Sequence, residues 1–405
     1  MRTLTLLFLL ACKGKTPPTV AAPTVERSTD PRSAGVRDPR LAALLGEHWD
    51  GMMRRFPTWA TALGDHRFDG DAPDSSAAAE DAWEAQLADW TKRLKALDRL
   101  DAADAVTRDL LVTELEGELG KSICEYGAWS FSPRSNPMLD GNDTGERFRI
   151  ETVQDSVNLV RRVEGLARDV HVQARRIQDG AARGLVANRP STELVIQQVR
   201  DQLAMPLEEQ PLMAPRERIP SGFTPAEAES FRNGLTTAAR HWLEAMEVWV
   251  TTLEADVLPI ARVDGEGILG IPNGLECYDA MIRSHTTLPL SADEVHATGL
   301  AEIQRLHAEV AELGRQSLGV DDVQAIFERL RTDPQLYFET EDQVEAKARE
   351  ALARAKAAIP DWFGRLPETD CVVDRVPPYE APYTTIAYYR QAVPGERPGA
   401  YVVNT

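Results

Sequence analysis

The chain has 405 residues, of which 43% are hydrophobic, 6% aromatic and 27% charged, and its formal net charge is −19. A chain of this length can bury a large core, and length alone would allow two or three domains. The acidic balance argues against nucleic-acid binding and against charge-driven docking on anionic lipid, because both partners are themselves negative.

The first residues have the pattern of a targeting segment. Arg2 precedes an apolar run, Leu4–Leu10, that is too short to cross a bilayer. Residues 9–12, Leu-Leu-Ala-Cys, resemble the lipobox of bacterial lipoproteins, which implies lipidation at Cys12; an ordinary signal peptide is the alternative. We expect residues 1–12 to be a lipoprotein signal peptide and residues 13–36, rich in Pro, Thr, Ala and Ser, to be a flexible tether.

Residues 37–405 are predicted to form one domain that is mainly α, a multi-helix all-α body with a small C-terminal β-hairpin or sheet element at 371–405. Apolar periodicity and capping residues predict helices at 40–55, 74–97, 102–124, 152–178, 191–205, 224–257, from 291 onward and at 340–359. Asp74 or Ser75 is the predicted N-cap of the second helix, and capping boxes are predicted at Thr224–Glu227 and Ser291–Glu294. In the helix that begins near Ser291, one apolar stripe is formed by Val295, Ile303, Leu306, Val310 and Leu313. The segment 125–142 has Gly and Pro and no period, and is predicted to be a loop.

Four cysteines are present, and one of them is Cys12. The other three, Cys124, Cys277 and Cys371, are widely spaced. An exported chain could form one disulfide among them and leave one thiol, but their spacing indicates no disulfide framework.

The last stretch changes to runs rich in Val, Ile, Thr and Tyr, which favour strands. Pro394 and Gly395 fit the two central positions of a tight turn, and the second position needs a positive φ. The pattern predicts a hairpin of residues 384–390 against 399–404. Both faces of the last strand are apolar. We expect the helices to cover one face and to leave the other face uncovered, and we expect one edge of the hairpin to stay uncovered as well.

Several segments together resemble the bacterial domain-of-unknown-function 885 family, which is similar to gluzincin metallopeptidases. They are FPTWATALGDHRFD at 56–69, LPLSADEVHATGLAEIQRL at 288–306, LRTDPQLYFET at 330–340, WFGRLP at 362–367 and RPGAYVVNT at 397–405. The resemblance implies that an intact member continues into a helix with the motif HExxPGHH, whose zinc activates a water for peptide hydrolysis. The chain ends before such a motif, so the resemblance implies the N-terminal portion of a peptidase-like protein that is inactive by itself.

The resemblance also implies that an edge strand near the chain end pairs with the backbone of a peptide substrate. It places Tyr389, Arg397, Tyr401 and Asn404 at that substrate-binding surface. Ordinary sheet packing is the alternative for each of these residues.

No other motif predicts a catalytic or metal centre. None of the seven histidines has a partner four residues away, the spacing of a helical zinc pair, so we expect no stoichiometric zinc in this chain. Residues 140–151 partly match a calcium loop, at Asp140, Asn142, Thr144, Gly145 and Glu151, but a turn before the next helix fits them better. The nucleophile, phosphate and dinucleotide motifs are absent.

Two functions are therefore predicted. The first is part of an exported, lipid-anchored, zinc-metallopeptidase-like protein of the cell envelope, with a peptide substrate, a membrane anchor at Cys12 and no nucleic-acid partner. The second is a stand-alone helical lipoprotein that serves as a binding or scaffold module.

Overall fold

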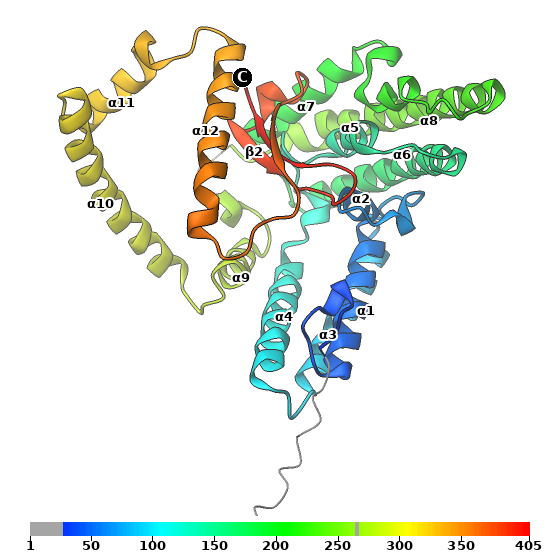
Figure 1. Cartoon of the computed structure of the whole chain (residues 1–405), viewed down its shortest axis with the longest axis horizontal. Coiled ribbons are helices and arrows are strands. Elements are labelled where there is room, and N and C mark those ends of the chain that lie inside the picture. The colour runs from blue at the N-terminus through cyan, green and yellow to red at the C-terminus, as the bar shows by residue number, and fades with distance from the viewer. Residues whose placement is uncertain (1–26, 264–266) are drawn as a thin grey trace, which may run out of the picture.

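The computed structural model describes residues 27–263 and 267–405 and confirms a mainly helical fold with a small C-terminal sheet (Figure 1). Residues 1–12, with Cys12, lie outside the described residues. The helices are α1 (Pro39–Arg55), α2 (Pro57–Ala62), α3 (Ala77–Lys95), α4 (Ala102–Gly120), α5 (Pro137–Arg147), α6 (Val153–Ala182), α7 (Arg189–Leu203), α8 (Pro225–Thr252), α9 (Gly274–Thr286), α10 (Ala292–Leu318), α11 (Val323–Thr332) and α12 (Glu341–Trp362). The strands are β1 (Cys371–Arg375), β2 (Ala387–Arg390) and β3 (Gly399–Val403).

The main core lies where α6 and α8 run side by side, with α5 and α7 packed against them (Figure 1). Helix α8 begins at the predicted capping box, in which Thr224 and Glu227 satisfy each other's backbone N–H groups. Trp242 and Trp249 of α8 are fully buried in this core. Not all apolar residues of α6 face this core. Val153 and Val157 near its start are exposed, whereas Val163 and the apolar residues that follow on the same face are buried.

A second core joins α1, α3 and α4. Helix α3 begins after Ser76, whose hydroxyl caps it, rather than after Asp74 or Ser75 as predicted, because the backbone N–H and hydroxyl of Ser75 bind Asp169 instead. Within the predicted tether, residues 28–36 fold into a closed turn and Val36 is buried in the second core. Residues 28–36, predicted as part of the tether, therefore pack against the folded body.

Helix α5 begins inside the predicted loop 125–142 and replaces its last third, from Pro137 onward. Asn136 caps the helix through its side chain, and Pro137 occupies the first turn. The sequence of α5 shows no apolar periodicity, because small residues let the helix pack closely against neighbours on several sides. A Cβ on Gly145 would lie 2.4 Å from the carbonyl oxygen of Pro211. The positions predicted as a turn, and compared with a calcium loop, therefore lie largely on a helix.

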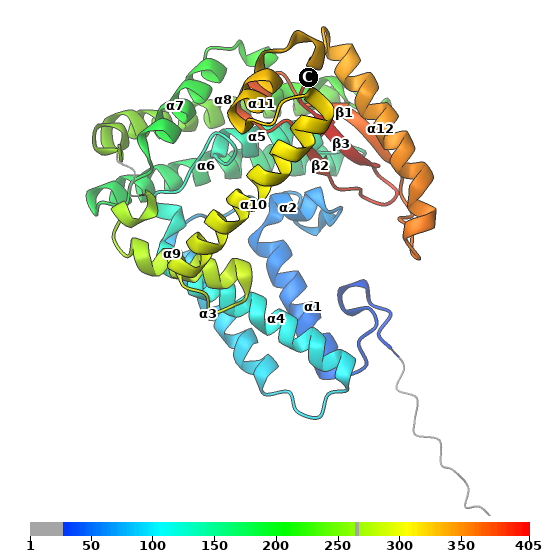
Figure 2. The ribbon, with the colours of Figure 1, turned by 90° about the vertical axis from the view of Figure 1, so that its left-hand side faces the viewer.

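Helices α10 and α11 extend away from the main body (Figure 1), and α12 returns to lie beside β1 of the sheet (Figure 2). The capping box at Ser291 forms as predicted. The apolar stripe of α10 is not buried, however, and Ile303, Leu306 and Leu313 are exposed. The apolar periodicity of α10 predicted a buried face, but no other element in the described part of the chain packs over that face.

The sheet contains the predicted hairpin and one pairing that was not predicted. β2 and β3 pair antiparallel around a turn in which Glu396 N–H donates to the Val393 carbonyl and Gly395 has φ +81°. β1 pairs parallel to the other side of β3. The final strand is therefore central, with order β1-β3-β2, and among the described strands the edge of the hairpin without a strand partner is that of β2.

The two faces of β3 are covered unequally. Ala400 and Val402 are buried in a small core with Val376, and Val403 on the opposite face is buried as well. Tyr401 is 40% exposed, and its partner across the antiparallel ladder, Tyr389, is 63% exposed. The expectation of one open face thus holds at the two tyrosines.

Cys124 and Cys277 form a disulfide that ties the end of α4 to α9, and Cys371 is a free thiol. The described helices include none that is long and apolar enough to span a membrane.

Candidate functional site

Two cavities, of about 190 Å³ and 280 Å³, lie on either side of the same three residues of α5: Asp140, Asp143 and Arg147. The smaller cavity faces α2, and the larger one faces the segment 379–388, which runs into β2. We call the two cavities together the α5 cleft. Helix geometry places the two carboxylates on one side of α5, because they are three residues apart.

The cleft wall carries the carboxylates of Asp140 and Asp143 beside the guanidinium groups of Arg147 and Arg162. Asp140 reaches solvent within the cleft, but protein surrounds it, and this desolvation, followed by the charges of Asp143 and Asp169, raises its pKa to about 7. Desolvation also raises the pKa of Asp143, against the ion pair that it forms with Arg147 at 3.0 Å. The cleft therefore gains negative charge as the pH rises through neutrality.

Tyrosines and a further acid form the opposite wall. The Tyr388 hydroxyl donates to Glu380 at 3.1 Å, and Tyr379 lies near Glu146 of α5. Desolvation raises the pKa of both tyrosines, so both remain protonated and able to donate. This wall offers an aromatic surface next to carboxylates, a combination that suits a cationic group.

The four predicted substrate-binding residues are not gathered in this cleft. Tyr389 and Tyr401 lie together on the open face of the sheet. Arg397 donates to the carbonyl groups of Ala62 and Gln391, and Asn404 donates to that of Ala381 at 2.8 Å. The guanidinium and the amide thus hold backbone segments of this chain in the arrangement seen here.

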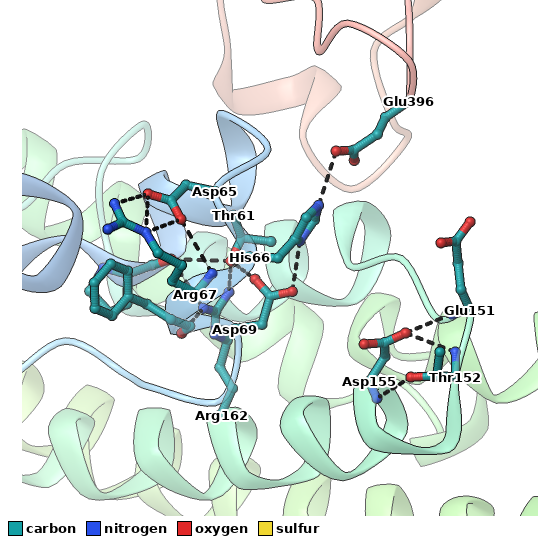
Figure 3. Close-up of polar contacts among 12 residues, drawn as sticks. Thr61, Asp65, His66, Arg67, Asp69, Glu151, Thr152, Asp155, Arg162 and Glu396 are labelled. Atoms are coloured by element: carbon teal, nitrogen blue, oxygen red, sulfur yellow. Dashed lines mark hydrogen bonds and ion pairs between the residues drawn. The ribbon is translucent and has the colours of Figure 1, made fainter. Parts of the chain in front are cut away.

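The turn between β2 and β3 docks on the segment Phe56–Asp69, far away in sequence (Figure 3). Gly64 has φ +84°, and a Cβ there would lie 2.5 Å from Val393 Cγ1, so glycine is required for this close approach. His66 lies between two carboxylates, with Nδ1 2.8 Å from Asp69 and Nε2 3.0 Å from Glu396 (Figure 3). The segment that resembled a family signature is therefore a docking surface for the hairpin.

We expect the contribution of His66 to depend on pH. Desolvation opposes its charge, but hydrogen bonds to Glu396 and Asp69 outweigh this and raise the pKa of His66 above its ordinary value. A raised pKa adds stability that is fully present below pH 6.5 and is lost as the pH rises through the folded-state pKa. His66→Gln should therefore lower stability by about 1 kcal/mol at pH 6 and by clearly less at pH 9, since the ring is partly exposed. Urea denaturation at both pH values measures this difference.

Glu396→Gln and the double variant provide the control. At pH 6 the stability losses of His66→Gln and Glu396→Gln should sum to more than the loss of the double variant, because each single substitution removes the same ion pair. Equal losses for His66→Gln at pH 6 and pH 9 would show that the imidazole acts only by packing.

A sequence model of the family described as "Bacterial protein of unknown function (DUF885)" matches residues 57–405. The chain belongs to the DUF885 family. Among solved structures, it is similar to one from Colwellia psychrerythraea described as a "putative lipoprotein", with a TM-score of 0.77 and 16% sequence identity. The similarity covers 90% of this chain and 67% of that one, and at this identity it shows a shared fold. No curated protein matches the chain.

Sequence reasoning missed the cleft residues of this DUF885 member because it treated the start of α5 as a loop. The available signal was Asn136-Pro137, an N-cap residue followed by proline at the first helical position. A helix from that point would have placed Asp140, Asp143 and Arg147 on one side.

Proposed function

We propose that this chain is the peptide-binding part of an exported, metallopeptidase-like DUF885 protein, and that the α5 cleft receives the positively charged amino group of a peptide. The observation that carries the proposal is the pair Asp140 and Asp143, which line both cavities and face tyrosines across the larger one. A carboxylate in a partly desolvated wall binds an ammonium group more strongly than a fully hydrated one does.

The family resemblance implies zinc chemistry for an intact protein. The described part of this chain contains no group of three or more His, Cys, Asp or Glu side chains placed to hold a metal ion. We propose, from the resemblance, that a zinc motif, and with it hydrolysis, belongs to polypeptide outside this chain. Support comes from the uncovered stripe of α10, the open face at Tyr389 and Tyr401, and the third of the Colwellia protein that has no counterpart here.

We also propose that the protein is exported and anchored through Cys12. The disulfide between Cys124 and Cys277 supports export, because structural disulfides are typical of oxidising compartments. The description of the Colwellia protein as a "putative lipoprotein" is in line with an anchor.

A second candidate function is a stand-alone binding module in the cell envelope. The observation that favours it is the central position of β3, with Val402 and Val403 buried by this chain alone. The polypeptide encoded directly after Thr405 distinguishes the two: a HExxH motif within it supports the peptidase, and its absence supports the module.

The proposed peptide site can be tested by calorimetry with tetra-alanine, comparing a free with an acetylated amino terminus. At pH 8 the peptide with the free amino terminus should bind about tenfold more tightly than the acetylated peptide. A factor of ten corresponds to the free energy of about one charge-assisted hydrogen bond. The difference should shrink below pH 6, where Asp140 is protonated. Asp140→Asn should remove most of the preference, while Glu229→Gln, which removes a carboxylate charge at an exposed position of α8, should leave it intact. Equal binding of both peptides at pH 8 would contradict the amino-group site.

A further inference from the structure

The larger cavity of the α5 cleft, of about 280 Å³, is lined by charges of both signs. Its acidic residues are Asp140, Asp143 and Glu380. Arg147 also lines it, but Arg147 is paired with Asp143 at 3.0 Å. Arg134 lines it too and is exposed, and its guanidinium forms no ion pair or hydrogen bond with any described residue. Arg134 is therefore a cation of this cavity that a ligand can reach and that no described acid occupies.

The course of the chain separates Arg134 from the acid pair. Arg134 comes before Pro137, where α5 begins, and Asp143 lies six residues after Pro137. At a rise of 1.5 Å per residue, those six residues cover about 9 Å along the helix axis. The charges along this wall thus run from Arg134 through Asp140 to Asp143.

The opposite wall crosses the cavity near Arg134. Tyr383 donates to Asp201 of α7 at 3.2 Å, and Gln198, one turn earlier in α7, donates to the Pro133 carbonyl at 3.1 Å. The stretch that follows Tyr383 therefore lies close to the segment that carries Arg134. It contributes two hydroxyl side chains to the cavity lining, those of Thr384 and Thr385. This end of the cavity offers hydrogen-bond donors, whereas the other end offers carboxylates.

We propose that the α5 cleft takes short peptides with both ends free, and that Arg134 binds the carboxylate of the last residue. This inference rests on the proposed amino-group site and extends it to the other end of the ligand. Extended chain spans about 3.3–3.6 Å per residue, so about three residues cover the roughly 10 Å between the acid pair and Arg134. The volume of the cavity is at the lower limit of ligand pockets, which also favours a few residues. A guanidinium suits this role because it can bind a carboxylate through two parallel hydrogen bonds.

The first test is calorimetry of the full chain at pH 8 with tri-alanine and with tri-alanine amide, both with a free amino end. The free carboxylate should bind about tenfold more tightly, through about one charge-assisted hydrogen bond. The net charge of −19 makes this result specific, because long-range electrostatics alone would favour the amide, which is a net cation. Equal binding, or tighter binding of the amide, would overturn the proposal.

The second test uses variants of exposed arginines. Arg134→Gln should abolish the preference for the free carboxylate and should leave the preference for a free over an acetylated amino end intact. Arg175→Gln is the matched control, because Arg175 is exposed on α6 and does not line the cavity. A carboxylate preference that survives Arg134→Gln would overturn the role of Arg134.

Peptide length is a further readout. Penta-alanine, whose carboxylate would extend past Arg134, should bind about tenfold more weakly than tri-alanine and should bind as its own amide does. Equal affinity of the two lengths would contradict the limit on length. If acid and amide bind alike while acetylation of the amino end still weakens binding, this inference fails and the amino-group site stands. If acetylation has no effect, or if tri-alanine does not bind at roughly 10 mM, both fail.

Discussion

Replacing Arg162 with Met should lower the free energy of unfolding by about 3–5 kcal/mol, because it breaks a buried charged network. Arg162 of α6 is 1% exposed. Its guanidinium donates to the Thr61 hydroxyl at 2.8 Å and to the carbonyl groups of Pro57, Phe68 and Asp71 at 3.0, 2.8 and 2.9 Å. The variant strands these acceptors in a desolvated region, and urea denaturation at pH 7 measures the loss.

The neighbouring Arg161 is the matched control. Its side chain is 60% exposed, and it donates to the Gly70 carbonyl and to Asp71. Arg161→Met should cost at most about 1 kcal/mol, as is usual for exposed ion pairs. Similar losses for both variants would mean that burial does not decide the energy of these contacts.

The Arg162 network extends to the hairpin. The Thr61 hydroxyl that accepts from Arg162 donates to Asp69 at 2.6 Å, and Asp69 in turn binds His66 (Figure 3). The segment Phe56–Asp69 is thus held by α6 on one side and holds the β2–β3 turn on the other. We therefore expect Arg162→Met to loosen the hairpin as well.

Removing the disulfide, with Cys124→Ala and Cys277→Ala together, should lower stability by about 3–5 kcal/mol. The two cysteines are 153 residues apart, so the bond restricts a long loop of the unfolded chain. Both residues are buried, so a reductant should reach the bond only when this region opens. Denaturation of the oxidised parent and the double variant measures the difference.

The free thiol provides the control for the disulfide. Cys371→Ala should change stability little, because Cys371 is unpaired and half-buried at the start of β1. A double variant as stable as Cys371→Ala would show that the bond does not form or does not constrain the unfolded chain.

Local sequence determined the features whose causes lie within a few residues. The capping boxes at Thr224 and Ser291 form as predicted, because cap and partner are only three residues apart. Pro394-Gly395 likewise specifies the hairpin turn, since the positive φ needs glycine. Strand alternation predicted the face that carries Tyr401, and the structure adds Tyr389 across the ladder.

Tertiary structure decided what depends on partners distant in the chain. Sequence pattern could not show that β1 pairs with β3, because a parallel pairing leaves no local turn signal. It could not show that α10 keeps its apolar stripe exposed, because periodicity identifies an apolar face but not what covers it. The candidate site follows the same rule. Asp140 and Asp143 are unremarkable acids on a short helix until the segment 379–388 folds over them, because a cleft and its desolvation exist only once both walls are in place.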